Sequence, residues 1–334
     1  ILYHMPQTLR AKKSKKLEIF DRFFNNKGDI VAQAQSNGRI QAEVVLSLFT
    51  YAKLEDLLMG TVNSDLVYGA NLGEASEEDL HLWVVTKKVG LSEWVDPMDP
   101  ERVLPSGVVL DHETVAQAAQ SLLIRELGIE FPVKLRSLQY FDNPARAGSE
   151  RVIAFPFWGV VDISQIASLL GGKDQVGLQA VNSRGAIKEL RERLSSEKFD
   201  GTSLFGYRVM PDAERGHYKY LPEDFQGTKI LGLDHDLMVF YAWRRLRYAF
   251  DAKVDPMRAI GVNPLGDDFR LSELQELYEV SLGETLQRDA FRRAMLDQKR
   301  PFIEESGETD SSRQGKPAKV YRLKSWAVPK RSRG

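Results

Sequence analysis

The hydrophobic pattern of the chain changes period several times, and these changes predict its secondary structure. Two short, continuous apolar runs, Val44–Tyr51 and Leu80–Val85, are typical of buried strands. Thr114–Leu127 instead repeats apolar residues at helical spacing, and Gly128 follows as the glycine that commonly ends a helix. Another helical stretch begins at a cap, Asp234, and runs to about Phe250. The pattern therefore predicts mixed α and β structure.

Two shorter helices with a tight turn between them are predicted nearer the C-terminus. Ser272 is the predicted cap of the first, with Gln275 completing a capping box. Leu282 and Gly283 break the helical pattern, and Thr285 is the predicted cap of the second helix. A linker containing Pro256, Pro264 and two glycines is expected to precede this pair.

The second short helix carries opposite chemistry on its two sides. Leu286, Ala290, Phe291, Ala294 and Met295 are predicted to cluster on one side. Arg288 and Arg292 fall on the other, with Arg293 on the flank. A basic helix set across a tight turn from an apolar one is typical of a helix-turn-helix, whose second helix enters the major groove of DNA. A helical hairpin with a solvated charged face stays the alternative.

Two predicted strands follow this helix pair, Phe302–Glu305 and Ala318–Leu323, with the polar run Ser306–Gly315 between them as a loop. Together they would add a wing to the helix-turn-helix. Four basic residues lie on or beside this wing: Arg313, Lys316, Lys319 and Arg322. Every charged residue from Ser311 to Gly334 is basic, which suits contacts to phosphate.

Composition narrows the classes of protein without choosing among them. The 334 residues suffice for two or three domains, and a net charge of −1 means that any affinity for DNA must come from local patches. Because cysteine is absent, disulfides, thiolate metal sites and a cysteine nucleophile are excluded. No run approaches the roughly 18 apolar residues of a membrane span. We expect a cytoplasmic protein without membrane contact, metal or cofactor.

The stretch around the first predicted helix resembles the Nudix box. Gly107 is followed after five residues by Glu113, and the helix ends in Glu126-Leu127-Gly128-Ile129. In Nudix hydrolases the carboxylates of this helix hold Mg²⁺, a cation that needs oxygen ligands. Here Leu122 and Arg125 occupy two of the three glutamate positions, and Glu126 alone remains. The resemblance therefore implies the Nudix scaffold without its metal site or catalytic residues.

Further segments are similar to the Nudix-related transcriptional regulators typified by the repressors of NAD metabolism. They are Leu138–Arg146, Arg151–Val161, Leu233–Asp236, Arg244–Tyr248, Phe269–Gln275, Phe291–Arg293 and Gly315–Arg322. The resemblance implies an α+β protein, with an N-terminal Nudix-like α/β/α sandwich around a mixed sheet and a C-terminal winged helix-turn-helix.

The expected boundaries follow from the same segments. They are a basic N-terminal extension (1–41), an effector-sensing domain (42–232) with an insertion around 163–226, a connecting helix and linker (233–268), a DNA-binding domain (269–325) and a basic tail (326–334). The basic run Arg10–Lys16 in the extension is interpreted as solvated, with a DNA-contacting arm as the alternative.

In function, the resemblance implies a homodimeric repressor that binds double-stranded operator DNA until a small effector binds. ADP-ribose, a related nucleotide or a sugar is the implied effector. Lys87, Arg125 and Glu126 are the candidate residues of the effector site, where the two cations would face a phosphate. One competing hypothesis is an active Nudix hydrolase of ADP-ribose or a nucleoside diphosphate derivative. Another is a nucleotide-binding scaffold without affinity for DNA.

Overall fold

A computed structural model describes most of the chain between Ile40 and Ala327. The described residues are 40–59, 67–68, 79–88, 102–144, 146, 151–170, 176–183, 202–203, 207–212, 217–221, 231–251, 255–296, 301–311, 317–325 and 327. Residues 1–39 of the predicted basic extension lie outside them, as do Arg313 and Lys316, whereas Ile40 and Gln41 begin the first strand. Among the described helices, none is long and apolar enough to cross a membrane.

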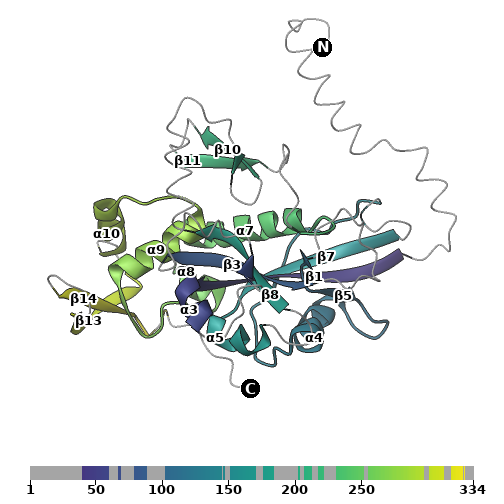
Figure 1. Ribbon diagram of the computed structural model, residues 1–334, viewed down its shortest axis with the longest axis horizontal. Coiled ribbons are helices and arrows are strands. Elements are labelled where there is room, and N and C mark those ends of the chain that lie inside the picture. The colour runs from purple at the N-terminus through teal and green to yellow at the C-terminus, as the bar shows by residue number, and fades with distance from the viewer. Residues whose placement is uncertain are drawn as a thin grey trace, which may run out of the picture.

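A mixed β-sheet forms the centre of the first domain (Figure 1). Its strand order is β2-β8-β3-β1-β7-β6, and β4 and β5 pair with β3 and β1. The strands are β1 (Ile40–Lys53), β2 (Val67–Tyr68), β3 (Leu80–Lys88), β4 (Arg102–Val103), β5 (Ser106–Val108), β6 (Arg136–Ser137), β7 (Arg151–Val160) and β8 (Val176–Ser183). Strand β1 runs antiparallel to β3 and parallel to β7, so the predicted mixed sheet is confirmed.

Helices cover both faces of this sheet, which explains why β1 is buried continuously from Val44 to Ala52. One face packs against α3 (Leu54–Met59), α4 (Val115–Leu127), α5 (Ile163–Ile166) and the short 3₁₀ helix η3 (Ala167–Leu169). The other face packs against α7 (His235–Asp251) and the C-terminal domain. The sandwich architecture predicted from the sequence is therefore confirmed.

The C-terminal domain is a winged helix at one end of the sheet (Figure 1). Its elements are α8 (Pro256–Ile260), β12 (Asp268–Arg270), α9 (Leu271–Leu282), α10 (Arg288–Leu296), β13 (Ile303–Asp310) and β14 (Ala318–Leu323). The wing sheet has the order β12-β14-β13. Strand β13 continues to Asp310 through a bulge after Glu305, so the start of the predicted loop is strand instead.

Several predicted helix boundaries are wrong in detail. Arg270 occupies the cap position of α9, where its backbone N–H donates to Glu273 Oε2 at 2.7 Å, so Ser272 lies inside the helix. Helix α10 begins at Arg288, later than a cap at Thr285 would place it. The predicted linker contains the helix α8, which Asp255 caps through the backbone N–H groups of Met257 and Arg258.

The segment 163–226 is also more than an addition to the sandwich. Strand β8 lies inside the sheet between β2 and β3, so this part of the segment completes the fold. Its later part contains a separate three-stranded sheet of β9 (Thr202–Ser203), β10 (Tyr207–Asp212) and β11 (His217–Leu221).

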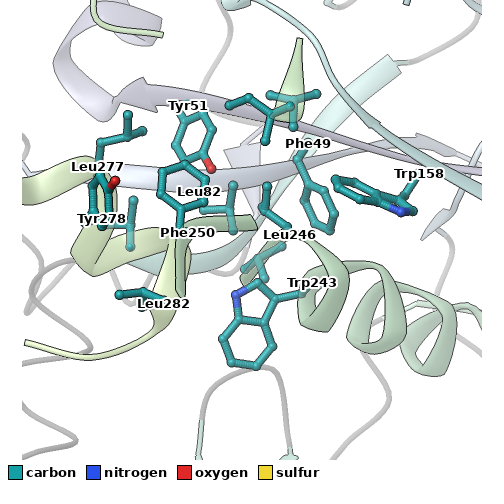
Figure 2. Packing of buried hydrophobic residues seen from close by; sticks show 14 of the residues in the cluster. Phe49, Tyr51, Leu82, Trp158, Trp243, Leu246, Phe250, Leu277, Tyr278 and Leu282 are labelled. Atoms are coloured by element: carbon teal, nitrogen blue, oxygen red, sulfur yellow. The ribbon is translucent and has the colours of Figure 1, made fainter. Parts of the chain in front are cut away.

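The two domains share one hydrophobic core. Phe49 and Leu82 of the sheet pack in the same cluster as Leu246 of α7 and Leu277 and Tyr278 of α9 (Figure 2). Burial of apolar surface is the main favourable contribution to packing of this kind. The winged helix is therefore held against the sheet as well as joined to it by the chain.

Candidate DNA interface and box helix

Helix α4, which we call the box helix, is held tightly against β5. Thr114 and Gln117 form a reciprocal capping box at its start, and Gly128 ends it with φ of 63°. A Cβ on Gly107 would lie 2.7 Å from Leu122 Cδ1, so any larger residue would force the Leu122 side chain to shift. Leu122 itself is fully buried in the core beneath the helix.

Two ion pairs occupy the charged groups of this region. Lys87 Nζ lies 2.5 Å from Glu126 Oε2, and both side chains are only partly exposed. Arg125 lies 3.7 Å from Glu113 Oε1. The structure thus brings Lys87 and Glu126 together, while Arg125 pairs with the other glutamate of the box. Both cations already have carboxylate partners, with which an effector phosphate would compete.

The residues of the box helix do not fit Mg²⁺. The remaining carboxylate, Glu126, is paired with an ammonium group, and the neighbouring ligand positions hold an alkyl chain (Leu122) and a cation (Arg125). Mg²⁺ requires several oxygen ligands in octahedral arrangement. Across the described parts of the chain, no three His, Cys, Asp or Glu residues gather closely enough to hold a metal ion.

Helix α10 presents its arginines to solvent. Phe291 and Met295 anchor it to the core, and Arg288, Arg292 and Arg293 are exposed as the pattern predicts. Ala290 and Ala294, which were expected on the apolar side, are exposed because the helix contacts the core along a narrow stripe. Asp289 is exposed between these arginines.

The wing brings a further cation to the same surface. Lys319 Nζ lies 2.7 Å from Glu305 Oε1. The hydrogen bond that Lys319 donates to Glu305 raises the pKa of Lys319, whereas the charge of Arg292 acts in the opposite direction. Lys319 and the arginines of α10 are thus exposed cations of one domain. Arg322 has two partners within the wing sheet: it donates to Ser306 O at 3.3 Å and lies 3.6 Å from Asp268 Oδ1.

The turn between α9 and α10 is fixed by a residue that sequence reasoning missed. Glu279 is buried, and its Oε1 accepts from Leu286 N at 2.9 Å and from Gln275 Nε2 at 3.0 Å. A glutamate four residues before Gly283, amid the apolar positions of α9, was the available signal. Arg247 of α7 adds an ion pair to Glu284 in the same turn, so this arginine serves the interdomain face.

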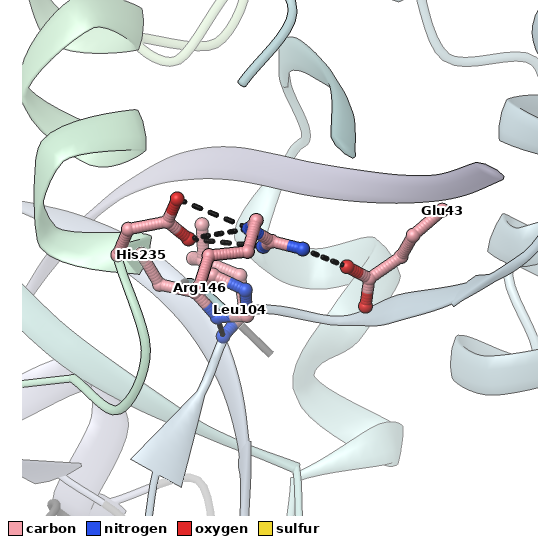
Figure 3. A network of polar contacts seen from close by, with 5 residues as sticks. Glu43, Leu104, Arg146 and His235 are labelled. Carbon is pink, nitrogen blue, oxygen red and sulfur yellow. Dashed lines mark hydrogen bonds and ion pairs between the residues drawn. The ribbon is translucent and has the colours of Figure 1, made fainter. Parts of the chain in front are cut away.

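Two of the motifs behind the family resemblance meet in a buried polar network (Figure 3). Arg146 binds Glu43 Oε2 at 2.5 Å and Asp234 Oδ1 at 2.9 Å, while His235 Nδ1 accepts from Leu104 N at 3.0 Å. Burial lowers the pKa of His235 to about 4, so the ring is neutral near neutral pH. The Asp234 side chain thus ties α7 to the sheet domain through Arg146.

The fold and these surfaces define a two-domain protein with a Nudix-like sandwich and a winged helix at its C-terminal end. Residues 261–323 match the model of the NrtR DNA-binding winged helix domain. The C-terminal domain is therefore a winged helix domain of the NrtR type, and the resemblance predicted from the sequence is confirmed. No curated protein matches the sequence.

Three solved structures are similar to this chain at low sequence identity. A MutT/nudix family protein from Enterococcus faecalis has a TM-score of 0.50 and 17% identity, with 93% of this chain and 98% of that chain covered. NrtR from Shewanella oneidensis, complexed with a 27mer DNA, has a TM-score of 0.48 and 17% identity, covering 86% and 95%. The Nudix domain of that NrtR, complexed with ADP ribose, has a TM-score of 0.32 and 14% identity, covering 66% and 99%.

Proposed function

We propose that this protein is a transcriptional repressor that binds operator DNA as a homodimer and releases it when a nucleotide or sugar metabolite such as ADP-ribose binds the Nudix-like domain. One observation carries the DNA-binding part. The arginines of α10 and Lys319 of the wing are exposed cations of one domain, which matches the NrtR DNA-binding winged helix. Such a protein would work in the cytoplasm.

The positions of the cations suggest a division of labour. Arg288 and Arg292 lie on the exposed face of the presumed recognition helix, where a guanidinium can bind guanine through two hydrogen bonds. Lys319 is on the wing, where an ammonium suits phosphate. Arg293 shares the exposure of the other arginines. We also assign DNA contacts to Arg313 and Lys316 from the sequence, together with Arg322.

For the sensing part, Lys87, Arg125 and Glu126 remain our candidate residues. Their ion pairs surround the end of the box helix, and a phosphate would have to displace Glu126 from Lys87 or Glu113 from Arg125. ADP-ribose is the first compound to test, because the motif resemblance is to regulators of NAD metabolism.

Titration of the protein with DNA from upstream of its own gene tests the DNA-binding proposal. Arg292→Ala should remove a base contact of about 1–3 kcal/mol and relax specificity at one position. Lys319→Ala should weaken all sequences alike and lower the salt slope by about one unit. Arg245→Ala, an exposed arginine of α7, is the charge-matched control. Arg288→Ala is measured alongside these variants. Equal losses of DNA affinity in the control and in the alanine variants at Arg288, Arg292 and Lys319 would refute this interface. Unchanged DNA affinity in all three variants would refute it as well.

An active hydrolase is the second candidate, because Gly107, Glu113 and Glu126 keep their places around the box helix. We expect no Mg²⁺-dependent turnover of ADP-ribose, NAD or nucleotide sugars, since Lys87 neutralises the one remaining helix carboxylate. Product release over many turnovers, abolished by Glu126→Gln, would establish the hydrolase instead.

A further inference from the structure

The C-terminal end of α9, the first helix of the helix-turn-helix, is buried against the sheet domain. Leu277, Val280 and Ser281 have no exposed surface. Around them lie the ends of β1 and β8 and the middle of α7, and Figure 2 shows Tyr51 and Leu82 facing Leu277 and Tyr278. This contact joins the two domains directly, without passing through the chain that connects them.

Three side chains from outside the winged helix bind this helix end. Asn182 Nδ2 of β8 donates to Val280 O at 2.9 Å, and Trp243 Nε1 of α7 donates to Ser281 O at 2.9 Å. The last four carbonyl groups of an α-helix have no partner within the helix. Val280 and Ser281 belong to this last turn, so β8 of the first-domain sheet and α7 together cap α9.

Tyr51 of β1 makes the third contact, at 2.7 Å between its Oη and Ser281 Oγ. Ser281 Oγ in turn lies 2.7 Å from the carbonyl oxygen of Leu277, to which its hydroxyl donates. The Tyr51 hydroxyl must therefore be the donor to Ser281. Burial raises the pKa of Tyr51, so the phenol keeps the proton that this bond needs.

The capped end of α9 leads at once to the DNA-binding helix. Gly283 follows with φ of 71°, and Glu279 holds Leu286 across the turn. The covalent connection on the other side of α9 includes Gly266, which has φ of 77° and accepts a hydrogen bond from Asn263 Nδ2. Hydrogen bonds are directional, whereas apolar packing is not. The two carbonyl caps and the Tyr51–Ser281 hydrogen bond can therefore set the angle of the helix pair.

We infer that Tyr51, Asn182 and Trp243 are positioning residues, which fix the orientation of α10 by binding the end of α9 from the sheet of the first domain and from α7. A shift of β1 or β8 would then reach the DNA surface through α9. The connection at residues 261–267 would then carry little of the signal. This inference rests on the proposed function for its purpose, but the orientation itself can be measured without DNA or effector.

The absence of cysteine in the sequence makes that measurement direct. Cysteines introduced at two exposed positions, Ile124→Cys on α4 and Ala294→Cys on α10, would carry spin labels. Pulsed electron resonance on the full chain, diluted with unlabelled protein, then gives the distance distribution between the domains. We expect one narrow distribution in this background. The double variant Tyr51→Phe, Asn182→Ala should broaden it or add a second distance. Insertion of two glycines after Gly266 should leave it narrow.

Two results would overturn the inference. One is a narrow distribution in the Tyr51→Phe, Asn182→Ala variant, because packing alone would then fix the orientation. The other is broadening by the glycine insertion, because the connection would then hold the domains. If ADP-ribose changes the DNA affinity of the parent protein, the double variant should lose most of that change, and its own DNA affinity without ADP-ribose should be lower than that of the parent. A protein whose DNA affinity ignores ADP-ribose would contradict the proposed sensing and leave the distance result standing.

Discussion

At the scale of single residues, Glu305 stands out because it pairs with Lys319, the wing lysine of the proposed DNA interface. Its carboxylate pairs with Lys319 at 2.7 Å, and both groups are largely exposed. A DNA phosphate has to compete with this carboxylate for the ammonium group. The pair should therefore lower the affinity for every DNA sequence to a similar extent.

Glu305→Gln should accordingly raise DNA affinity, by roughly three- to tenfold at low salt, and steepen the salt dependence. Both effects follow because Lys319 would lose its carboxylate partner. Its charge would then be balanced by salt anions in the free protein, and these anions would be released when phosphate binds. Glu308→Gln removes the same charge from an exposed position of β13 and is the matched control. Fluorescence anisotropy over a salt series measures both quantities. Equal gains in the two variants would mean that net charge alone is responsible.

His235 should make stability depend on pH. Its pKa is about 4 in the fold against 6.5 for the free side chain, so the unfolded chain binds more protons between these values. Its stabilising contribution is complete above pH 6.5 and is lost as the pH falls toward 4, by about 3 kcal/mol in all.

Urea unfolding of His235→Asn should show a smaller loss of stability over this pH range than the parent protein. Asparagine is chosen because its side-chain oxygen can accept from Leu104 N as the ring nitrogen does. Glu43, Asp234 and Arg146 surround the histidine in both proteins, so their own titration is common to the comparison. Identical pH dependence of the two proteins would exclude His235 as the cause.

At the scale of elements, the turn between α9 and α10 depends on Glu279. Glu279→Ala should destabilise the protein by about 2 kcal/mol, because it leaves the Leu286 N–H without its charged acceptor. It should also weaken DNA binding, since α10 loses its fixed start. Ser272→Ala serves as control, with an expected change below about 0.5 kcal/mol, because Ser272 is not the helix cap. Chemical unfolding of both variants measures these changes in the free energy of unfolding. A large loss of stability in Ser272→Ala would contradict the observed cap.

Elements were predictable from the sequence where their pattern is local. The strands β1 and β3, the box helix with its glycine end, and α7 follow directly from apolar spacing. The cap of α9 was misplaced because two residues that can form a capping box, Ser272 and Gln275, lie close to the true pair. Strand β8 was missed because its place in the sheet depends on pairing with β3, a partner far away in sequence.

The candidate sites were likewise predictable only where the sequence pattern is local. Exposure of Arg288 and Arg292 follows from helical periodicity, but the ion pairs of Lys87 and Lys319 depend on contacts between distant segments. Neither Glu126 nor Glu305 could be assigned a partner from spacing alone. The interdomain caps Tyr51, Asn182 and Trp243 lie in three separate elements, and no local pattern marks them.

At the scale of the whole molecule, the box helix and α10, the proposed DNA-binding helix, lie toward opposite ends of the protein (Figure 1). Any communication between an effector and DNA must therefore cross the shared core, and α9 offers the direct route. A ligand can shift such an equilibrium only by its difference in affinity for the two states, typically about 1–3 kcal/mol. Linkage requires that DNA weaken the effector by the same factor.

Calorimetric titration of ADP-ribose into free protein and into protein saturated with operator DNA tests this antagonism most directly. We predict about 5- to 150-fold weaker binding to the DNA complex, matched by an equal loss of DNA affinity when ADP-ribose is saturating. The same experiment on Arg125→Ala tests the candidate effector site. Equal affinity of ADP-ribose for free and DNA-bound protein would contradict the account of this chain as a regulator released by that ligand.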